Sequence, residues 1–310
     1  MTARSDEQDV AAPASADGDV RGAAVPHVVV IVLNWCGERD TAECLESLAR
    51  CDWPRLTVLL VDNGSPDGSG ARLHARFPEL PYLQTGANLG YTGGNNRGFD
   101  WALAHGADHV VVLNNDTVVE PDLIARLVEA AEADARVGGV APKILVHGAP
   151  GTLWYAGGDI GLARGAGLHR AEYAPDRGHD APGPVTFMTG CCFLITRRAL
   201  EAIAGFEESF FAYNEDVDLS YRLCEAGFAL VYEPRARLAH KVPPPGAEPS
   251  PFQIEQRDRN RRRFIALRAA PAVRARFHAW FYATRLGLLG RYVLRRDWAR
   301  ARAIVRGALT

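Results

Sequence analysis

The apolar residues in the first half of the chain gather into short runs that alternate with segments of helical spacing. Residues 27–33 form a continuous run rich in β-branched side chains, and residues 57–61 and 109–113 form two similar runs. Short runs without a polar interruption are typical of strands that are buried on both faces, as in a parallel sheet. Residues 82–84 predict one more short strand between the last two of these runs.

The segments between the runs carry apolar residues three or four positions apart. They predict helices over 38–50 and 95–105, and a further helix that begins at Pro121, since proline is favoured in the first turn of a helix. Strands that alternate with helices indicate βαβ units joined by right-handed connections. The sequence therefore predicts an α/β fold with a mostly parallel central sheet flanked by helices.

The second half of the chain has a less regular pattern. Residues 151–184 are rich in Gly and Pro and predict loops, whereas residues 185–196 form an apolar run. A helical pattern opens after Asn214 and ends at Gly227, which is a favourable residue just beyond a helix. A further strand is predicted over 228–232.

These patterns divide the chain into three parts. Residues 1–26 lack apolar periodicity and predict a disordered leader, with no apolar stretch of signal-peptide length. Residues 27–245 are expected to form the α/β domain, and residues 246–310 a basic, amphipathic, helical C-terminal extension. The most apolar part of this extension, residues 277–294, is interrupted by charges and is too polar to span a bilayer unaided.

The charge is distributed unevenly along the 310 residues. The formal net charge of −2 provides no global field that would collect nucleic acid, so no nucleic acid partner is expected. Residues 257–310, however, contain 15 Arg and two acids, so this segment carries +13 and the preceding residues carry −15. A basic tail on an acidic body indicates an anionic partner. The extension either contacts an anionic membrane surface peripherally, or packs on the body, or forms a homo-oligomer contact.

Composition and cysteine usage describe a globular protein of a reducing compartment. Hydrophobic residues make up 47% of the chain and charged residues 23%, which excludes a disordered chain. The six Cys form no C-x-x-C pair and have no zinc spacing with His. We therefore expect a cytoplasmic protein, which would lie at the inner membrane face if the extension contacts lipid.

Short polar side chains follow three of the predicted strands at the point where each strand ends. They are Asn34 after the first strand, Asp62 and Asn63 after the second, and Asn114, Asn115 and Asp116 after the fourth. Ligands of parallel sheets bind beyond the carboxyl ends of the strands, so these side chains are expected to share one site. The oxygens of the last group suit Mg²⁺ or Mn²⁺ on a diphosphate. Turn and cap chemistry explains each group when it is taken alone.

A glycine-rich segment spans residues 88–98. Its glycines would let the backbone approach a ligand closely, and the N-terminus of the helix that follows would suit a phosphate. It matches neither a Walker loop nor the G-x-G-x-x-G fingerprint after the first strand, which argues against a dinucleotide dehydrogenase. The alternative interpretation is a turn followed by close helix packing.

Acidic residues cluster where the helix after Asn214 begins. Glu215, Asp216 and Asp218 complement the helix dipole, which is their structural explanation. They also follow three aromatic residues in 207–213, and an apolar surrounding raises the pKa of a carboxyl, as a general base requires. His240 could ligate a metal, although a lone histidine is more often structural.

Taken together, these segments resemble the inverting glycosyltransferase family 2, of GT-A fold, and within it the rhamnosyltransferase-like subgroup. The resemblance covers about residues 28–241 and is carried by six segments in the expected order. They are Val32-Leu33-Asn34-Trp35, Val61-Asp62-Asn63-Gly64-Ser65, Asn88-Leu89-Gly90-Tyr91-Thr92-Gly93-Gly94-Asn95, Leu113-Asn114-Asn115-Asp116, Thr189-Gly190-Cys191-Cys192 and Glu215-Asp216-Val217-Asp218. One such segment would be weak, whereas six in order are specific.

The resemblance implies a role for each matching residue. Asp62, with Asn34, would hold the base and ribose of a nucleotide. Other residues would line the pocket of the nucleotide-sugar donor: Asn63, Asn88, Gly93, Gly94, Asn95, Asn114, Asn115, Trp154, Thr189 and Gly190. Asp116, with His240 as a second ligand, would hold a divalent metal, Mg²⁺ or Mn²⁺. Asp216 would be the general base, with Glu215 as its neighbour. The family's usual metal motif is Asp-x-Asp, but Asn114 stands at the first position here, so the metal could arrive bound to the nucleotide.

The resemblance thus implies an inverting sugar transfer from a nucleotide-diphosphate donor to an acceptor hydroxyl in one displacement. The acceptor would be a cell-surface glycan precursor or a natural product. Two alternatives stay open. A sugar nucleotidylyltransferase would normally carry a basic glycine-rich loop after the first strand, which residues 34–37 lack. A non-catalytic nucleotide-sugar binding protein would not need the Glu215–Asp216 pair. Release of nucleotide diphosphate, rather than pyrophosphate, separates the three.

Overall fold

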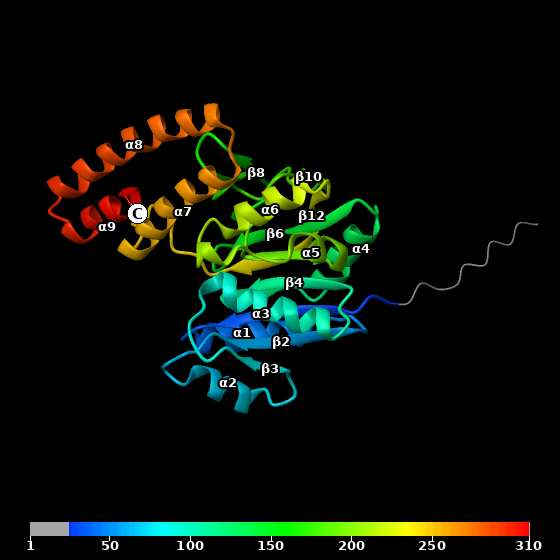
Figure 1. Ribbon diagram of the computed structural model, residues 1–310. Helices are drawn as coiled ribbons and strands as arrows, with labels where there is room; N and C mark the ends of the chain where they lie inside the picture. Colours follow the sequence, from blue (N-terminus) through cyan, green and yellow to red (C-terminus); the bar gives the residue numbers. More distant parts are fainter. Residues whose placement is uncertain (1–24, 310) are drawn as a thin grey trace, which may run out of the picture.

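The structure is a computed structural model that describes residues 25–309. The leader predicted for residues 1–26 therefore lies outside the described residues, except for Val25 and Pro26. The described part contains a large mixed sheet with helices on both faces and three further helices at the C-terminal end (Figure 1).

The large sheet has the strand order β10-β12-β6-β11-β4-β1-β2-β3, with β5 pairing with β12 and β7 with β6. Its strands are β1 (Val28–Asn34), β2 (Leu56–Asp62), β3 (Tyr82–Gln84), β4 (His109–Asn114), β5 (Thr117–Val119), β6 (Val137–Val146), β7 (Leu153–Tyr155), β10 (Gly183–Val185), β11 (Cys192–Thr196) and β12 (Ala229–His240). A separate small sheet pairs β8 (Gly158–Gly161) with β9 (Ala166–His169). The strands β3, β2, β1 and β4 are parallel to one another, whereas β11 runs antiparallel between β4 and β6.

Helices cover both faces of the sheet and extend beyond it. They are α1 (Glu38–Leu48), α2 (Ser69–Arg76), α3 (Gly90–Ala104), α4 (Leu123–Glu132), α5 (Arg197–Ile203), α6 (Glu215–Glu225), α7 (Pro251–Arg268), α8 (Pro271–Leu294) and α9 (Trp298–Leu309), with a 3₁₀ turn η1 (Glu208–Phe210). The predicted α/β architecture is confirmed, and the first four predicted strands match β1 to β4 within one residue at each end.

Some predicted elements differ from the structure because of packing. Residues 151–184, predicted as loops, contain the short strands β7, β8 and β9 and the start of β10. The helix predicted over 95–105 begins five residues earlier, at Gly90. Its glycines allow a close approach to β1, since a Cβ on Gly94 would lie 2.6 Å from Leu33 Cδ1. Close helix packing, the alternative interpretation of this segment, is therefore present, and contact of its glycines with a ligand stays a prediction. The strand predicted over 228–232 continues to His240, because β12 pairs with both β6 and β5.

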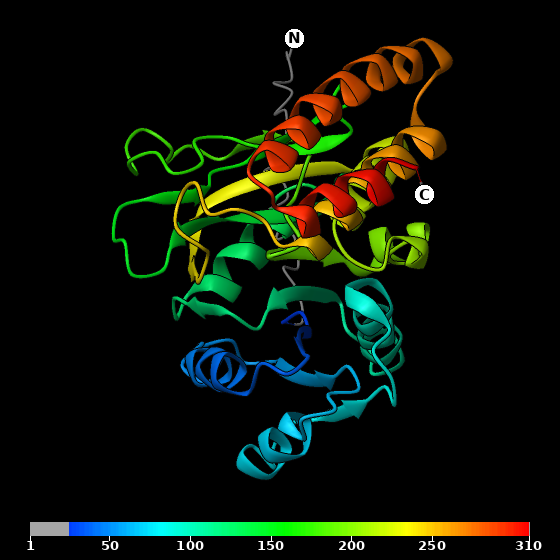
Figure 2. The same cartoon turned by 90° about the vertical axis from the view of Figure 1, so that its left-hand side faces the viewer.

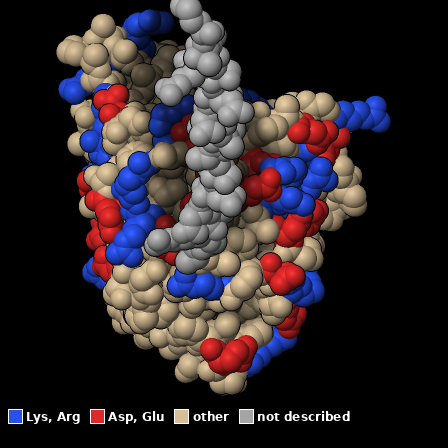
Figure 3. Space-filling view, turned by 90° about the vertical axis from the view of Figure 1, so that its right-hand side faces the viewer, with Lys and Arg blue, Asp and Glu red and all other residues tan. Residues whose placement is uncertain are grey.

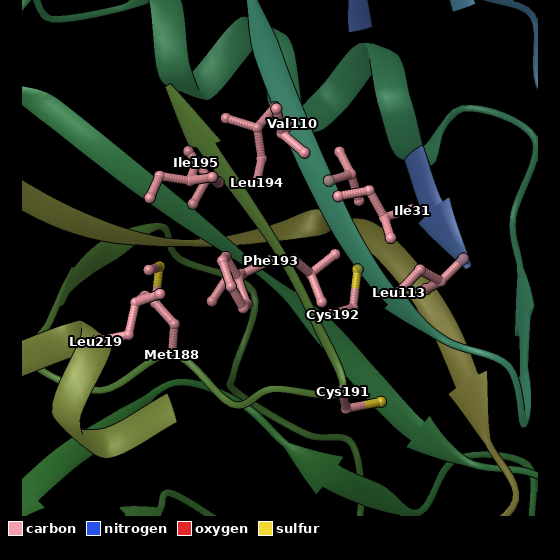
Figure 4. Close-up of a cluster of buried hydrophobic side chains, with 14 of the residues drawn as sticks. Ile31, Val110, Leu113, Met188, Cys191, Cys192, Phe193, Leu194, Ile195 and Leu219 are labelled. Atoms are coloured by element: carbon pink, nitrogen blue, oxygen red, sulfur yellow. The ribbon is translucent and has the colours of Figure 1, made fainter. Parts of the chain in front are cut away.

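The core lies on both sides of β11 and β4. All five residues of β11 are buried, and they pack with side chains from neighbouring strands and from α6. Figure 4 shows part of this cluster, with Ile31, Val110, Leu113, Met188, Cys191, Cys192, Phe193, Leu194, Ile195 and Leu219. All six cysteines lie within the described residues and are free, so Cys191 and Cys192 are core residues, as the sequence predicts.

The C-terminal helices pack on the body through α7 and the first half of α8. A capping box starts α7, in which Ser250 Oγ accepts a hydrogen bond from the Gln253 amide. Phe264 of α7 and Phe277 and Phe281 of α8 are buried in the main core. The α9 helix packs on α7 and α8 in a second cluster, as Figure 2 shows from the side of these helices.

The helices predicted for the C-terminal extension are present as α7, α8 and α9, whereas its amphipathic character stays a prediction. Within residues 25–309, no helix combines the length and the hydropathy that crossing a bilayer would require. On the face shown in Figure 3, acidic and basic side chains are interspersed, so the asymmetry of charge along the chain does not give a surface of one sign there.

Candidate active site

The carboxyl ends of β1 and β2 bring Asn34 and Asp62 side by side. The two residues are register partners, and Asn34 Nδ2 donates a hydrogen bond to Asp62 Oδ1 at 3.0 Å. The same amide group donates to Ser65 Oγ and Ser69 Oγ, both at 3.1 Å. The other oxygen of Asp62, Oδ2, accepts a hydrogen bond from Gln84 Nε2 of β3. This network fixes a buried carboxylate at the rim of the sheet.

Asn63 and Asn88 fix the entry into α3. Asn63 Nδ2 donates to the Gly90 carbonyl at 2.9 Å and to Asn88 Oδ1 at 3.2 Å. Gly90 has a φ of +73°, and a Cβ there would lie 2.5 Å from Phe211. Three of the predicted donor-pocket residues, Gly93, Gly94 and Asn95, are buried within α3. The structure gives these residues a packing role, and contact with a donor stays a prediction for them.

A hydrogen-bond chain leads from Asn34 to the end of β4. Thr41 Oγ1 donates to Asn34 Oδ1 at 3.0 Å and accepts from Asn115 Nδ2 at 2.8 Å. Asn114 pairs with Leu33 in the sheet, and its amide donates to the Cys191 carbonyl at 2.8 Å. The polar residues that follow three different strands thus lie at one edge of the sheet, as the sequence predicts.

Asp116 and His240 face each other beside this edge. Asp116 Oδ1 lies 3.1 Å from His240 Nε2, because β5 pairs with the end of β12 and sets Thr117 opposite His240. Among the described residues, Asp116 Oδ1 and His240 Nδ1 are buried without a well-aligned hydrogen bond, so the contact between Asp116 Oδ1 and His240 Nε2 leaves the carboxylate oxygen incompletely satisfied. A buried carboxylate oxygen beside an imidazole nitrogen is a suitable position for a cation. The described chain holds no cluster of three or more metal-ligating side chains, so other ligands would have to complete the coordination.

Aromatic side chains connect this pair to the start of α6. The Trp154 ring lies 4.5 Å from His240 and 4.6 Å from His169 between ring centroids, with both contacts edge-on. His169 lies at the end of β9, and burial lowers its pKa while the charge of Asp216 opposes this. Sequence reasoning missed His169, because it follows a short glycine-rich strand with no motif of its own.

The first turn of α6 holds two adjacent carboxyls, the buried Glu215 and the half-buried Asp216. Asp216 Oδ2 accepts a hydrogen bond from the Gly190 amide and Oδ1 accepts one from the Val217 amide, both at 2.9 Å. Burial raises the pKa of Asp216, and it raises the pKa of Glu215 well above its usual value, with the charge of Asp216 adding to the effect. Glu215 Oε2 is buried and has no hydrogen-bond partner in residues 25–309. Thr189 and Gly190 thus border this carboxyl pair.

The loop before α6 has a strained backbone that is held from α7. Phe211, Tyr213 and Asn214 have positive φ angles of 62°, 70° and 71°. The buried side chain of Asn260 opposes this strain, since its Nδ2 donates to the carbonyls of Phe210, Ala212 and Tyr213 at 2.8, 2.8 and 2.7 Å. We interpret Asn260 as a positioning residue for the two carboxyls. The sequence offers one signal for it, an uncharged residue in an Arg run, four positions before the apolar Phe264.

Asn260→Ala tests this interpretation. The variant leaves three loop carbonyls without their donor, at a cost of about 1–3 kcal/mol for a buried group. If the loop relaxes and moves the α6 carboxyls, kcat falls by roughly tenfold or more, while the KM for the donor changes little. The control is Arg302→Ala, an exposed residue of α9. A loss of thermal stability with an unchanged kcat would show that Asn260 is structural only.

Two sets of contacts lie between Asp62, Asp116 and Asp216. Hydrogen bonds connect Asp62 through Asn34 and Thr41 to Asn115, the residue before Asp116. Ring contacts connect His240, which faces Asp116, through Trp154 to His169, whose pKa the charge of Asp216 raises. The site combines a fixed carboxylate, an acid–imidazole pair suited to a cation, and a half-buried carboxyl of raised pKa. Such a set can bind a polar ligand and accept a proton from it.

Sequence comparisons agree with this chemistry. The sequence model of the family described as glycosyltransferase like family 2 matches residues 26–265. An N-acetylglucosaminyl-diphospho-decaprenol L-rhamnosyltransferase of Mycobacterium tuberculosis is 34% identical over 232 residues, which cover 66% of this chain and 73% of the relative. A low-salt glycan biosynthesis hexosyltransferase of Haloferax volcanii, Agl10, is 28% identical over 62% of this chain and 60% of that protein.

Solved structures share the fold at low sequence identity. The mannosyltransferase PcManGT from Pyrobaculum calidifontis, in complex with GDP-Man and Mn²⁺, has a TM-score of 0.57 at 18% identity, over 92% of this chain and 86% of the other. GalNAc-T7, with UDP, GalNAc and Mn²⁺, has a TM-score of 0.63 at 16% identity, over 84% of this chain and 51% of the other. The GT-A fold implied by the sequence motifs is confirmed. The chain therefore belongs to glycosyltransferase family 2 and is a glycosyltransferase.

Proposed function

We propose that this enzyme transfers a sugar from a nucleotide-diphosphate donor to an acceptor hydroxyl with inversion, and that Asp216 is the general base. The observation that carries the proposal is the half-buried Asp216 carboxyl, which the backbone N–H groups of Gly190 and Val217 orient beside the buried Glu215. Family membership favours sugar transfer over the two alternatives, nucleotidylyl transfer and non-catalytic binding.

The proton transfer follows from the carboxyl pair. Two adjacent carboxyls resist ionising together, and burial raises the pKa of both Glu215 and Asp216, so the pair titrates as a unit and shares a proton more readily than two separate carboxyls would. Asp216 then accepts the proton of the acceptor hydroxyl as its oxygen attacks the anomeric carbon. The bond to the nucleotide diphosphate breaks on the opposite face, so a single displacement inverts the configuration. A carboxyl with a raised pKa accepts a proton at neutral pH more readily than an ordinary aspartate does.

The donor would lie along the rim of the sheet. Asp62 and Asn34 are positioned to bind the nucleoside, and Asp116 and His240 fit a divalent metal because their facing oxygen and nitrogen are 3.1 Å apart. The related folds contain Mn²⁺ together with a nucleotide or nucleotide sugar. When bound, such a metal supplies positive charge that stabilises the departing diphosphate. The diphosphate oxygens would complete a ligand set in which Asn114 replaces a carboxylate.

The acceptor that we propose is a glycan precursor on a lipid diphosphate. The mycobacterial relative is named for such a substrate, an N-acetylglucosaminyl-diphospho-decaprenol. The outer faces of α8 and α9 carry exposed apolar side chains among their arginines, including Leu286, Leu294, Trp298 and Leu309. This arrangement suits peripheral contact with the cytoplasmic face of a membrane. A second copy of the chain is the alternative partner for these faces.

A thermal-shift titration with nucleotide diphosphates, with and without Mn²⁺, tests the donor site. A ligand that binds only the folded state stabilises it by about 2.7 kcal/mol at 100 times its Kd. We expect one nucleotide diphosphate to raise Tm, with a larger rise in Mn²⁺. Asp116→Ala should remove the part that depends on Mn²⁺, whereas the matched control Asp100→Ala, on the exposed side of α3, should keep it. If no nucleotide diphosphate raises Tm in either condition, the proposed donor site is wrong.

A further inference from the structure

A basic cavity of about 430 Å³ lies between α7 and α8, apart from the carboxylate site. It is lined by Arg259, Arg262, Arg263, Ala266, Leu267 and His278. All of these residues except His278 belong to α7 and recur every three or four positions, so they share one face of that helix. The neighbouring face of α7 carries Asn260 and contacts the loop before α6. None of the described residues that line the cavity is acidic.

The donor groups of this cavity are poorly satisfied. Arg262 makes one long hydrogen bond, 3.4 Å from Nη1 to the Gly307 carbonyl, and its buried Nε finds no acceptor in the described structure. His278 Nδ1 is also buried and, within residues 25–309, lacks a hydrogen-bond partner. Arg259 and Arg306 both form ion pairs with the carboxylate of Glu255. Buried donors without acceptors are costly, and an anion with several oxygens would satisfy them.

We propose that this cavity binds a phosphate or diphosphate group at a site separate from the one for the donor nucleotide. Guanidinium groups match phosphate oxygens in pairs, which suits a cavity with three arginines. The surroundings of the cavity favour a membrane lipid as the molecule that carries this phosphate group. Leu267 on the rim is 49% exposed, and His278 stacks on Tyr282, from which the exposed Leu286 lies one turn further along α8. The inference concerns binding alone and does not depend on the transfer reaction.

The test compares two variants of the cavity with a control of equal charge. Arg262→Gln with Arg263→Gln removes two guanidinium groups from the cavity, and Arg50→Gln with Arg177→Gln removes two from exposed positions outside α7, α8 and α9. Because Arg263 also donates to the Ser209 carbonyl, Ala266→Phe serves as a second variant that fills the cavity and keeps every charge. Each full-length protein is checked by thermal melting. It is then assayed for co-sedimentation with phosphatidylglycerol vesicles against pure phosphatidylcholine vesicles, and for pyrophosphate binding by calorimetry.

Each outcome supports or overturns the proposal. Both cavity variants should bind roughly tenfold more weakly than wild type, since charged hydrogen bonds contribute about 1.5–3 kcal/mol, while the control binds like wild type. A loss seen with phosphatidylglycerol vesicles identifies a lipid phosphate, and a loss seen only with pyrophosphate identifies a soluble one. If the control double variant weakens binding as much as the cavity variants do, or if neither cavity variant changes it, the cavity is not an anion site.

Discussion

Asp216→Asn is expected to lower kcat by at least about 100-fold, because general base catalysis typically contributes about 10²–10⁴-fold. The amide has nearly the same shape as the carboxyl, but it has one acceptor oxygen, so it keeps one of the two hydrogen bonds from the Gly190 and Val217 amides. It cannot take a proton from the acceptor hydroxyl. Nucleotide binding, measured by thermal shift, should be preserved, since the hydrogen-bond partners of Asp216 differ from those of Asp62.

The pH dependence gives this prediction a second readout. Burial raises the pKa of Asp216, so the base is protonated, and kcat/KM falls, at a higher pH than for an ordinary aspartate. A raised pKa in the folded state also means that stability falls as the pH rises from the ordinary pKa of an aspartate to the raised pKa of Asp216. The Asn variant avoids this cost, which offsets the hydrogen bond that it loses, so it should melt close to the wild-type temperature at neutral pH and lose the acid limb of the profile.

The matched control for Asp216→Asn is Glu225→Gln at the exposed end of the same helix. It removes one carboxylate from α6 and should leave turnover unchanged. Wild-type turnover by Asp216→Asn would assign the base to another group, with Glu215 the first to examine.

Asp218→Asn, two residues further along α6, is expected to have the opposite effect: a large loss of stability. Asp218 is fully buried and joins two helices, since it pairs with Arg222 Nε of α6 and with Arg268 Nε of α7, both at 2.7 Å. Removing one partner of a buried ion pair typically costs about 3–5 kcal/mol, because the other charge is left uncompensated. Arg222 and Arg268 are partly exposed, so we expect a loss at the lower end of this range, about 3 kcal/mol.

Denaturant unfolding measures this loss as a lower midpoint at an unchanged m-value. The contrast with Asp216→Asn, which changes the same atoms two positions earlier and should not lower stability, separates the structural acid from the catalytic one. A change in the free energy of unfolding within about 0.5 kcal/mol, as for ordinary surface substitutions, would contradict the role of Asp218 as the link between α6 and α7.

The sequence predicted the parts of the fold that depend on local pattern. Runs such as 27–33 and 57–61 are apolar throughout, and only a strand buried on both faces explains them. Because parallel strands end at the same edge, the residues after them had to converge, and Asn34, Asp62 and Asn115 do lie on one hydrogen-bonded chain. The order of the six motifs, compared with a known family, added the fold and the class of enzyme.

Features that depend on contacts between distant segments were missed or displaced. The start of α3 at Gly90 follows from its close approach to β1 and Phe211, which no local pattern contains. His169 reaches Trp154, and Asn260 reaches the loop before α6, only because β9 and α7 pack there. The basic cavity likewise needs α8 folded back against α7 before His278 can face the arginines.

The sequence by itself thus determined which segments form strands and helices, which polar residues meet at the sheet edge, and the family. These properties follow from residue periodicity and from the fixed direction of parallel strands. Only the tertiary structure decided that Glu215 is buried and that the pKa values of Glu215 and Asp216 are raised. It also decided that Asp218 pairs with arginines of α6 and α7 inside the protein, and that a cavity lies between α7 and α8. The physical reason is that burial, pKa and pairing depend on which distant groups exclude water from a side chain, and spacing along the chain does not contain that information.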